Sequence, residues 1–175
     1  MKRDLHGVAA LTQRSRAAAA PRLRQAMGRF ATGVTVVTTA KDEADVHGMT
    51  ANGVMSVSLD PPLVVVSLRR ESRMDAMLPS TRRYAISVLA EDQEWLAMHF
   101  AGRPDPDRTP VVDWWDSLPF IDGAIAHVGC HVHAIHEAGD HRLWIGRVDY
   151  MAVGTGSPLL FYAGQFGALA TDEPS

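Results

Sequence analysis

The feature that most constrains the fold is the segment GMTANGVMSVSLDPPLVVVSL at residues 48–68. In residues 48–59 polar and apolar side chains alternate, which is the period of a β-strand. The tripeptide Asp60-Pro61-Pro62 ends this strand, because proline cannot donate to a hydrogen-bond ladder and fixes its own φ. The apolar run at residues 63–66 predicts a second strand that is buried on both faces. We therefore expect two strands joined by a proline corner.

The two faces of the first strand differ in their chemistry. One face carries small polar side chains: Thr50, Asn52, Ser56 and Ser58. The other carries apolar side chains, which we expect to pack in the core: Ala51, Met55, Val57 and Leu59. Four small hydrogen-bonding groups in a row suit a bound polar ligand better than bulk water. A hydroxyl-rich outer face of a barrel has the same pattern, however, and the residues alone favour that interpretation.

The rest of the chain predicts more strands than helices. Helices are expected from Pro21 to Gly33, from Ser72 to Pro79 after a capping box, and at residues 92–100. Further strands are expected at residues 34–39, 84–89, 124–137, 141–153 and 159–162. Residues 103–119 contain four prolines and predict a long loop, pinned by Trp114 and Trp115. Seven strands with short connections favour a closed or split barrel over a doubly wound sheet, so the fold class is mainly β with a few helices.

Composition limits the class of protein further. A chain of 175 residues fits one domain, which we place at residues 21–170, between a flexible arm at 1–20 and a flexible C-terminus at 171–175. A net charge of −3 provides no general attraction for nucleic acid. No apolar run approaches the about 20 residues that cross a bilayer, and no secretory signal is evident. We therefore expect a cytoplasmic protein without membrane contact, and the single cysteine, Cys130, excludes an internal disulfide.

Five segments together resemble a known family. They are GMTANG with SVSLDPPLVVVSL, FATGVTVVT from Phe30, YAISVLAE from Tyr84, the tripeptide Gly139-Asp140-His141, and PLLFYAG from Pro158. This pattern resembles the short-chain flavin reductases, the reductase component of two-component flavin-dependent monooxygenases. The resemblance spans roughly residues 22–169, nearly the whole chain, and is far more specific than one motif.

The resemblance implies a fold and an activity. The fold would be a Greek-key split β-barrel, the FMN-binding split barrel, which binds flavin at a homodimer interface. The activity would be NAD(P)H-dependent reduction of FMN or FAD by hydride transfer to flavin N5, with NADH or NADPH as donor. The reduced flavin would then pass to a partner monooxygenase.

The resemblance also implies the site. His141, in the matching Gly-Asp-His motif, would lie beside the flavin and orient the hydride donor, although the residues alone fit an exposed turn histidine. Arg73 and nearby hydroxyls would hold the phosphate, where a plain turn with a helix cap fits as well. Phe100 and Tyr162 would wall the pocket, or serve as core aromatics. The implied cofactor-binding residues are Thr32, Gly33, Met49, Thr50, Ala51, Asn52, Ser56, Ser67, Ser72, Arg73, Phe100, Tyr162 and Gln165.

Other classes of site and function have weaker support. His127, His131 and His133 share a strand face, and the last two could chelate a metal, but a solvated strand face is favoured and we expect no metal site. The glycines at 154 and 156 lack the third glycine and the following helix of a dinucleotide fingerprint. Two rival functions remain: a split barrel that binds flavin or haem without turnover, and a metal-binding barrel. Oxidation of NADH with excess free flavin separates the reductase from the first rival.

Overall fold

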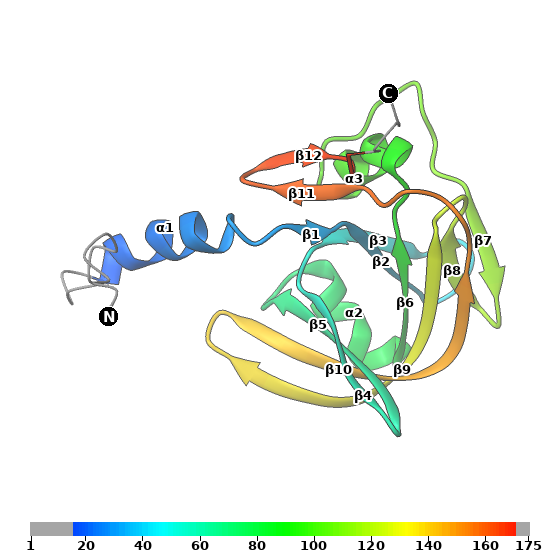
Figure 1. Cartoon of the computed structure of the whole chain (residues 1–175). Helices are drawn as coiled ribbons and strands as arrows, with labels where there is room; N and C mark the ends of the chain where they lie inside the picture. Colours follow the sequence, from blue (N-terminus) through cyan, green and yellow to red (C-terminus); the bar gives the residue numbers. More distant parts are fainter. Residues whose placement is uncertain (1–15, 171–175) are drawn as a thin grey trace.

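A seven-stranded antiparallel sheet forms the body of the protein. The computed structural model describes residues 16–170, so the predictions for residues 1–15 and 171–175 lie outside the described part. The strands of this sheet, in spatial order, are β3 (Val46–Ala51), β2 (Thr35–Ala40), β6 (Arg83–Val88), β9 (Ala126–Ala138), β10 (His141–Val153), β5 (Pro62–Arg69) and β4 (Val54–Leu59). Every neighbouring pair is antiparallel. The sheet curls around helix α2 (Arg73–Thr81) and stays open between its first and last strands, which confirms the mainly β split-barrel fold (Figure 1).

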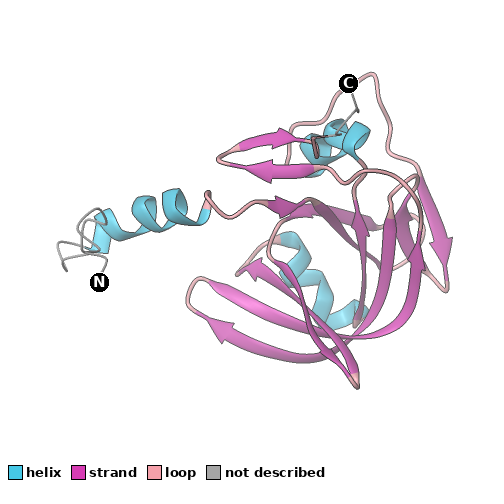
Figure 2. Ribbon diagram, in the orientation of Figure 1, coloured by secondary structure: helices cyan, strands magenta, loops and turns pink. Residues whose placement is uncertain are grey.

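Two smaller strand groups and two more helices complete the described chain (Figure 2). A three-stranded sheet combines β1 (Thr32–Gly33), β11 (Leu160–Tyr162) and β12 (Gln165–Gly167). A hairpin joins β7 (Val112–Trp115) and β8 (Leu118–Ile121). Helix α1 (Arg16–Met27) projects away from the body, and α3 (Glu94–Phe100) follows a 3-10 turn at Glu91–Gln93. Among the described residues no helix is both long and apolar enough to cross a membrane.

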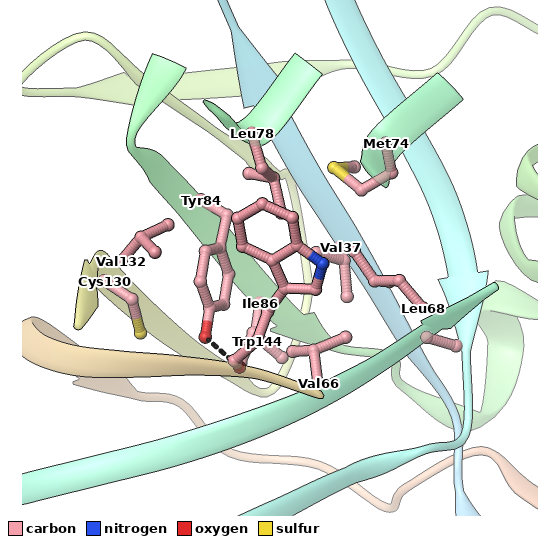
Figure 3. Close-up of a cluster of buried hydrophobic side chains, with 11 residues drawn as sticks. Val37, Val66, Leu68, Met74, Leu78, Tyr84, Ile86, Cys130, Val132 and Trp144 are labelled. Atoms are coloured by element: carbon pink, nitrogen blue, oxygen red, sulfur yellow. Dashed lines mark hydrogen bonds between the residues drawn. The ribbon is translucent and has the colours of Figure 1, made fainter. Parts of the chain in front are cut away.

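The main core lies between α2 and the inner face of the curled sheet. Trp144 and Tyr84 are fully buried there, and Met74 and Leu78 of α2 pack against the same cluster (Figure 3). Tyr84 Oη donates to the Trp144 carbonyl oxygen at 3.2 Å. The Tyr84 ring lies so close to Gly146 that a Cβ there would overlap its hydroxyl. Glycine at 146 therefore makes room for the aromatic pair.

A second core holds α3 against the edge strand β3. Its buried residues come from the β1–β2 segment, α3, β8 and the segments beside β6 and β11: Val34, Val36, Leu89, Leu96, Ala97, Ile121 and Leu159. Phe100 packs on Gly48, where an added Cβ would lie 2.5 Å from the Phe100 ring. Helix α3 therefore packs on the face of β2 and β3 that carries Val36, Gly48 and Thr50.

Three predicted elements have different bounds. The helix predicted from Pro21 begins at Arg16, because the alanine run at residues 17–20 has the highest helix propensity and offsets the internal proline. The helix predicted to end at Pro79 continues to Thr81, where Arg82 adopts a left-handed conformation and closes it. The predicted loop at 103–119 contains β7, and Trp115 stacks on Tyr150 with ring centroids 4.2 Å apart.

The prediction of one strand across residues 48–59 was wrong. The chain bends at Asn52 and Gly53, so that β3 pairs with β2 while β4 pairs with β5. These two strands are the opposite edges of the seven-stranded sheet. A register shift between Ser56 and Ser58 also interrupts the alternation in β4. Met55, Val57 and Leu59 consequently do not reach the core and are 62%, 47% and 88% exposed.

Candidate functional site

The bend at Asn52 and Gly53 bridges the split in the barrel. The Asn52 side-chain amide donates to Thr32 Oγ1 at 3.2 Å, which ties the bend to β1. On the other side, the Ser67 backbone N–H donates to the Gly53 carbonyl oxygen at 2.8 Å. A Cβ at residue 53 would lie 3.1 Å from Ser67 Cβ, so glycine allows this close approach. The bend therefore brings three predicted site residues together: Thr32, Asn52 and Ser67.

A hollow opens beside this bend. Its volume is about 410 Å³, and its lining residues are Arg24, Met27, Gly28, Phe30, Thr32, Asn52, Gly53 and Phe161. A second hollow of about 610 Å³ continues along α1 and shares Arg24, Gly28 and Phe161 with the first. Apolar side chains beside a few polar groups and an arginine are what a flat heteroaromatic ring with a phosphate-bearing tail requires. The bend is thus not filled by the protein's own side chains.

The predicted residues of β3 divide between two environments. Thr50 Oγ1 donates to the Ala97 carbonyl oxygen at 2.6 Å, so its hydroxyl is engaged by α3. Ala51 is buried in the main core, and Met49 packs against it. The side chains of these three residues therefore serve the fold, and only their backbone is left to face a ligand. The expected continuous polar face does not form, because Ser56 lies on the opposite sheet edge and is exposed.

Asn52 retains hydrogen-bonding capacity toward a ligand. A side-chain amide has two N–H donors and one carbonyl acceptor. One donor is used by Thr32 Oγ1. The second donor and the acceptor suit the polar edge of an isoalloxazine ring, where negative charge develops on reduction.

The loop after β5 places Ser72 and Arg73 at the start of α2. Ser72 Oγ accepts from the Asp75 backbone N–H at 3.2 Å, so it acts as the helix N-cap. Arg73 is exposed and pairs with Asp45 at 3.0 Å. Burial and the Arg73 charge lower the pKa of the neighbouring His47. The guanidinium is thus engaged by an exposed carboxylate that a phosphate would have to displace, and Arg73 is not part of the lining of either hollow beside the bend.

His141 begins β10, directly opposite Arg69 at the end of β5. Its Nδ1 lies 2.8 Å from Asp140 Oδ1, and this contact lowers the pKa of the Asp140 carboxyl group. Two positions further along the ladder, Leu143 lies opposite Ser67. Directly paired residues in an antiparallel sheet point to the same face. His141 and Ser67 therefore share a face, and the histidine side chain is partly exposed on it.

The remaining predicted residues lie around α3 and the C-terminal hairpin. Phe100 is mainly a core residue, as its packing on Gly48 shows. Tyr162 is half-exposed, and its hydroxyl accepts from Arg29 at 3.3 Å. Gln165 pairs with Tyr162 across the β11–β12 hairpin. Gly33 pairs with Leu160, so β1 and the hairpin together support the hollow.

Six lining residues were not among the predicted site residues: Arg24, Met27, Gly28, Phe30, Gly53 and Phe161. Phe30 and Phe161 lie inside the segments that carry the family resemblance, and Met27 and Phe30 fall within the helix predicted from Pro21 to Gly33. The sequence could therefore have identified Phe30 and Phe161 as site residues from their place in these segments. The sequence did not show that the end of α1 lies next to β11. The contact is a hydrogen bond of 2.8 Å from the Ala163 backbone N–H to the Gly28 carbonyl oxygen.

The histidines of β9 do not gather around a common point. His127 Nδ1 lies 3.3 Å from Ser87 Oγ, and burial lowers the pKa of this histidine. His131 Nδ1 lies 2.6 Å from Asp149 Oδ2. A register shift next to His133 separates it from the regular ladder. Within residues 16–170, no three histidine, cysteine or acidic side chains form a group that could hold a metal ion.

Fold and hollow together define a class of protein: a split barrel with a ligand-sized opening at the split. Residues 27–170 match the family model of the flavin reductase like domain. An NADH-dependent flavin reductase from Rhodococcus sp is 51% identical over 87% of this chain and 89% of the relative. The reductase subunit HsaB of a flavin-dependent monooxygenase from Rhodococcus jostii (strain RHA1) is 35% identical over 87% of this chain and 79% of the relative.

A solved structure with bound nucleotide fragments is also similar. It is the NADH:FAD oxidoreductase SgcE6 from Streptomyces globisporus C-1027 in complex with NAD and FAD fragments. It superposes with a TM-score of 0.81 at 34% identity, covering 93% of this chain and 99% of that one. The chain belongs to the flavin reductase family.

Proposed function

We propose that this protein is a flavin reductase that uses NADH to reduce FMN or FAD and releases the reduced flavin to a partner monooxygenase. The observation that carries the proposal is the open hollow at the bend, where Thr32 and Asn52 meet beside apolar walls from α1 and β11. Membership of the family and the activities of the relatives named above support the same reaction. When both nucleotides are bound, the chemistry is hydride transfer from nicotinamide C4 to flavin N5.

The protein's contribution to this reaction is placement. Asn52 orients the polar edge of the ring, while Met27, Phe30 and Phe161 exclude water from its faces. Arg24 and the exposed Arg73 supply charge for phosphate, with hydroxyls at Ser67 and Ser72 close to the same loop. His141 lies on the same sheet face as Ser67 and orients the nicotinamide. An open hollow of this kind suits a flavin that binds, is reduced and leaves.

A homodimer is part of the proposal. Edge strand β4 exposes Met55, Val57 and Leu59, and α1 exposes Leu23 and Met27. Exposed apolar side chains on a free strand edge are typical of an interaction surface. Size-exclusion chromatography with light scattering tests this assembly. The wild type should run as a dimer and Met55→Glu/Leu59→Glu as a monomer, whereas a monomeric wild type would remove the dimer from the proposal.

The reaction also implies a location and a domain extent. A reductase that consumes NADH must work where NADH is supplied, so we place the protein in the cytoplasm. Residues 21–170 form the catalytic unit, which agrees with the extent of the family match. Fractionation of cells with a marker for each compartment tests the location.

Steady-state kinetics test the activity. Catalytic amounts of purified protein with NADH and excess FMN or FAD should oxidise many equivalents of NADH per protein, and omission of flavin should stop the reaction. NADPH in place of NADH should be used less efficiently. Stoichiometric flavin binding without NADH oxidation would instead identify a binding protein without turnover.

Substitution of Asn52 tests the position of the site. Asn52→Ala removes at least one hydrogen bond to the ring, worth roughly 0.5–1.5 kcal/mol, so flavin should bind at least about 2- to 13-fold more weakly. Fluorescence titration of FMN measures the dissociation constant. Ser58→Ala, on the exposed edge strand away from the bend, is the matched control. A dissociation constant equal to that of the wild type would count against this placement of the ring.

A further inference from the structure

The buried carboxylate of Asp75 connects α2 and the loop before it to β10, next to His141. Asp75, in the first turn of α2, is only 2% exposed. Its Oδ1 accepts from Trp144 Nε1 at 2.9 Å, and its Oδ2 accepts from Arg142 Nη1 at 2.8 Å. The Glu71 backbone N–H lies 3.3 Å from the same Oδ2. Asp75 is thus fully hydrogen-bonded, as a buried charge must be.

Arg142 extends this connection to the surface. Its Nε donates to Glu137 Oε1 at 2.8 Å, so the planar guanidinium bridges one buried and one exposed carboxylate. Glu137 Oε2 in turn lies 3.3 Å from Arg70 Nη1. The Arg70 backbone N–H donates to the Asp140 carbonyl oxygen at 3.0 Å. The loop after β5 and the turn between β9 and β10 are therefore tied at several points.

The contacts between Asp75 and Arg142 lie on the side of β10 opposite to the side that carries His141. Arg142 and Trp144 alternate along β10 with His141 and Leu143. Trp144 lies in the main core against α2, so Arg142 and Trp144 share the inner face (Figure 3). His141 and Leu143 point to the outer face, opposite Arg69 and Ser67. Fixing Arg142 from inside therefore fixes the direction in which His141 points outside.

We propose that Asp75 and Arg142 are positioning residues, which hold the turn with His141 and the loop at residues 69–72 in one fixed relation, so that hydride donor and flavin are placed together. This inference rests on the proposed function. Asp75, Arg142 and His141 all lie outside the lining of the hollow at the bend, and the proposed effect reaches the hydride donor through His141. A buried ion pair of this kind is poorly explained by stability alone, because apolar replacements are often equally stable.

A double-mutant cycle separates positioning from simple stabilisation. Arg142→Gln should lower kcat/KM for NADH about 3- to 10-fold, at most the loss expected for His141→Ala, because it misplaces the His141 side chain without removing it. The flavin dissociation constant should change less than about twofold. In the His141→Ala background the same substitution should have almost no further effect on kcat/KM, because the side chain it positions is gone. Arg142→Lys should be intermediate, since lysine lacks the bidentate fork.

Two further variants keep this test decisive. Arg83→Gln is the matched control, because Arg83 also bridges two carboxylates, Asp116 and Asp149, but far from the turn; its kinetics should match the wild type. Glu137→Gln changes only the exposed end of the tie and should fold even if Arg142→Gln does not. It should lower kcat/KM for NADH in the same direction by a smaller factor. Equal losses in the wild-type and His141→Ala backgrounds, or no loss at all, would overturn the positioning role.

Hydrogen exchange provides a readout that does not need activity. In the free protein, Arg142→Gln should speed amide exchange together in the turn at residues 138–141 and the loop at 69–72. Unchanged exchange in both segments would overturn the tie. A wild type that does not oxidise NADH with flavin would instead overturn the proposed function and, with it, the positioning role. Exchange would still show whether the segments are joined, so the two failures can be told apart.

Discussion

Arg73 and Asp75 stand two residues apart in the first turn of α2, yet they make opposite kinds of ion pair. The Arg73 side chain is 63% exposed and pairs with Asp45 at the protein surface. Asp75 is 2% exposed and pairs with Arg142 inside the barrel. Exposed pairs contribute about 0–1 kcal/mol, whereas leaving a buried polar group without its hydrogen-bond partner costs about 1–3 kcal/mol. The first turn of α2 thus carries one side chain that is fixed in the interior and one that is weakly held at the surface.

The difference explains how one short segment can serve both the fold and a ligand. The inner contacts of α2 hold the turn and the loop in place before any nucleotide binds. In the proposed site, Asp45 would give up Arg73 to a phosphate at little cost, because water screens both partners. A site for a flavin that must leave again needs such a combination: a preorganised frame and weakly held charges around it.

The largest expected effect comes from breaking the inner pair. Asp75→Ala leaves the buried Trp144 indole N–H without its acceptor and leaves Arg142 paired with Glu137 alone, so the free energy of unfolding should fall by about 1–3 kcal/mol. Urea denaturation measures this loss. The exposed Asp107→Ala should change stability by less than about 0.5 kcal/mol. Equal, small losses in the two variants would show that the interior pair is no more important than a surface charge.

A second substitution tests the interior without touching a charge. Gly146→Ala places a methyl group against Tyr84, so the ring must shift and the free energy of unfolding should fall by about 1–3 kcal/mol. Gly167→Ala is the control, since nothing lies within 4 Å of an added Cβ there. If thermal unfolding of Gly146→Ala matched that of the control, the interior would be looser than the packing indicates.

His141→Ala tests the outer face of β10. We expect kcat/KM for NADH to fall roughly tenfold, because the hydride donor loses an orienting contact. Flavin affinity should stay within about twofold of wild type. His136→Ala, on the neighbouring strand, controls for general loss of a surface histidine. Wild-type kinetics for His141→Ala would remove this residue from the site.

A smaller effect, on FMN affinity, is expected from breaking the exposed pair of Arg73 and Asp45. Asp45→Asn removes the carboxylate that competes with phosphate for Arg73, so FMN should bind about 1.5- to 5-fold more tightly. Riboflavin, which lacks the phosphate, should bind equally to both proteins. Weaker FMN binding by Asp45→Asn would mean that Asp45 supports Arg73 in the bound state and does not compete with phosphate.

The smallest expected effect is a pH dependence of the unfolding free energy caused by His47, which lies near Arg73. The folded state lowers the pKa of His47, so the unfolded chain binds a proton more readily there. Stability should therefore fall as pH drops from about 6.5 through the folded-state pKa, and remain complete above that range. His47→Gln should flatten this part of the curve of unfolding free energy against pH. An unchanged curve would assign the slope to other groups, such as His127, whose pKa is also lowered.

The sequence predicted the fold class because the strand pattern is strong and the connections are short. It also predicted the cap at Ser72 and the turn before His141, which are local features. The division of residues 48–59 between two sheet edges was missed because the alternation continues through the bend. The dipeptide Asn52-Gly53, a typical turn sequence, was the signal for that bend.

The rest depends on contacts between distant parts of the chain. Alternation shows that Met55, Val57 and Leu59 share a face, but not whether that face is covered by this chain or by another. The pairing of Asp75 with Arg142 and Trp144 joins positions 67 and 69 residues apart, which no local pattern reveals. Thr50 has the expected polar character, yet α3 takes its hydroxyl.

The central claim is that the flavin ring lies at the bend that bridges the split. A crystal structure with bound FMN and NAD⁺ tests it most directly. We expect the isoalloxazine ring to lie against Thr32 and Asn52, with the nicotinamide next to His141. Flavin bound only elsewhere, for example in the hollow of about 700 Å³ lined by Lys41, Arg83 and Trp114, would contradict it.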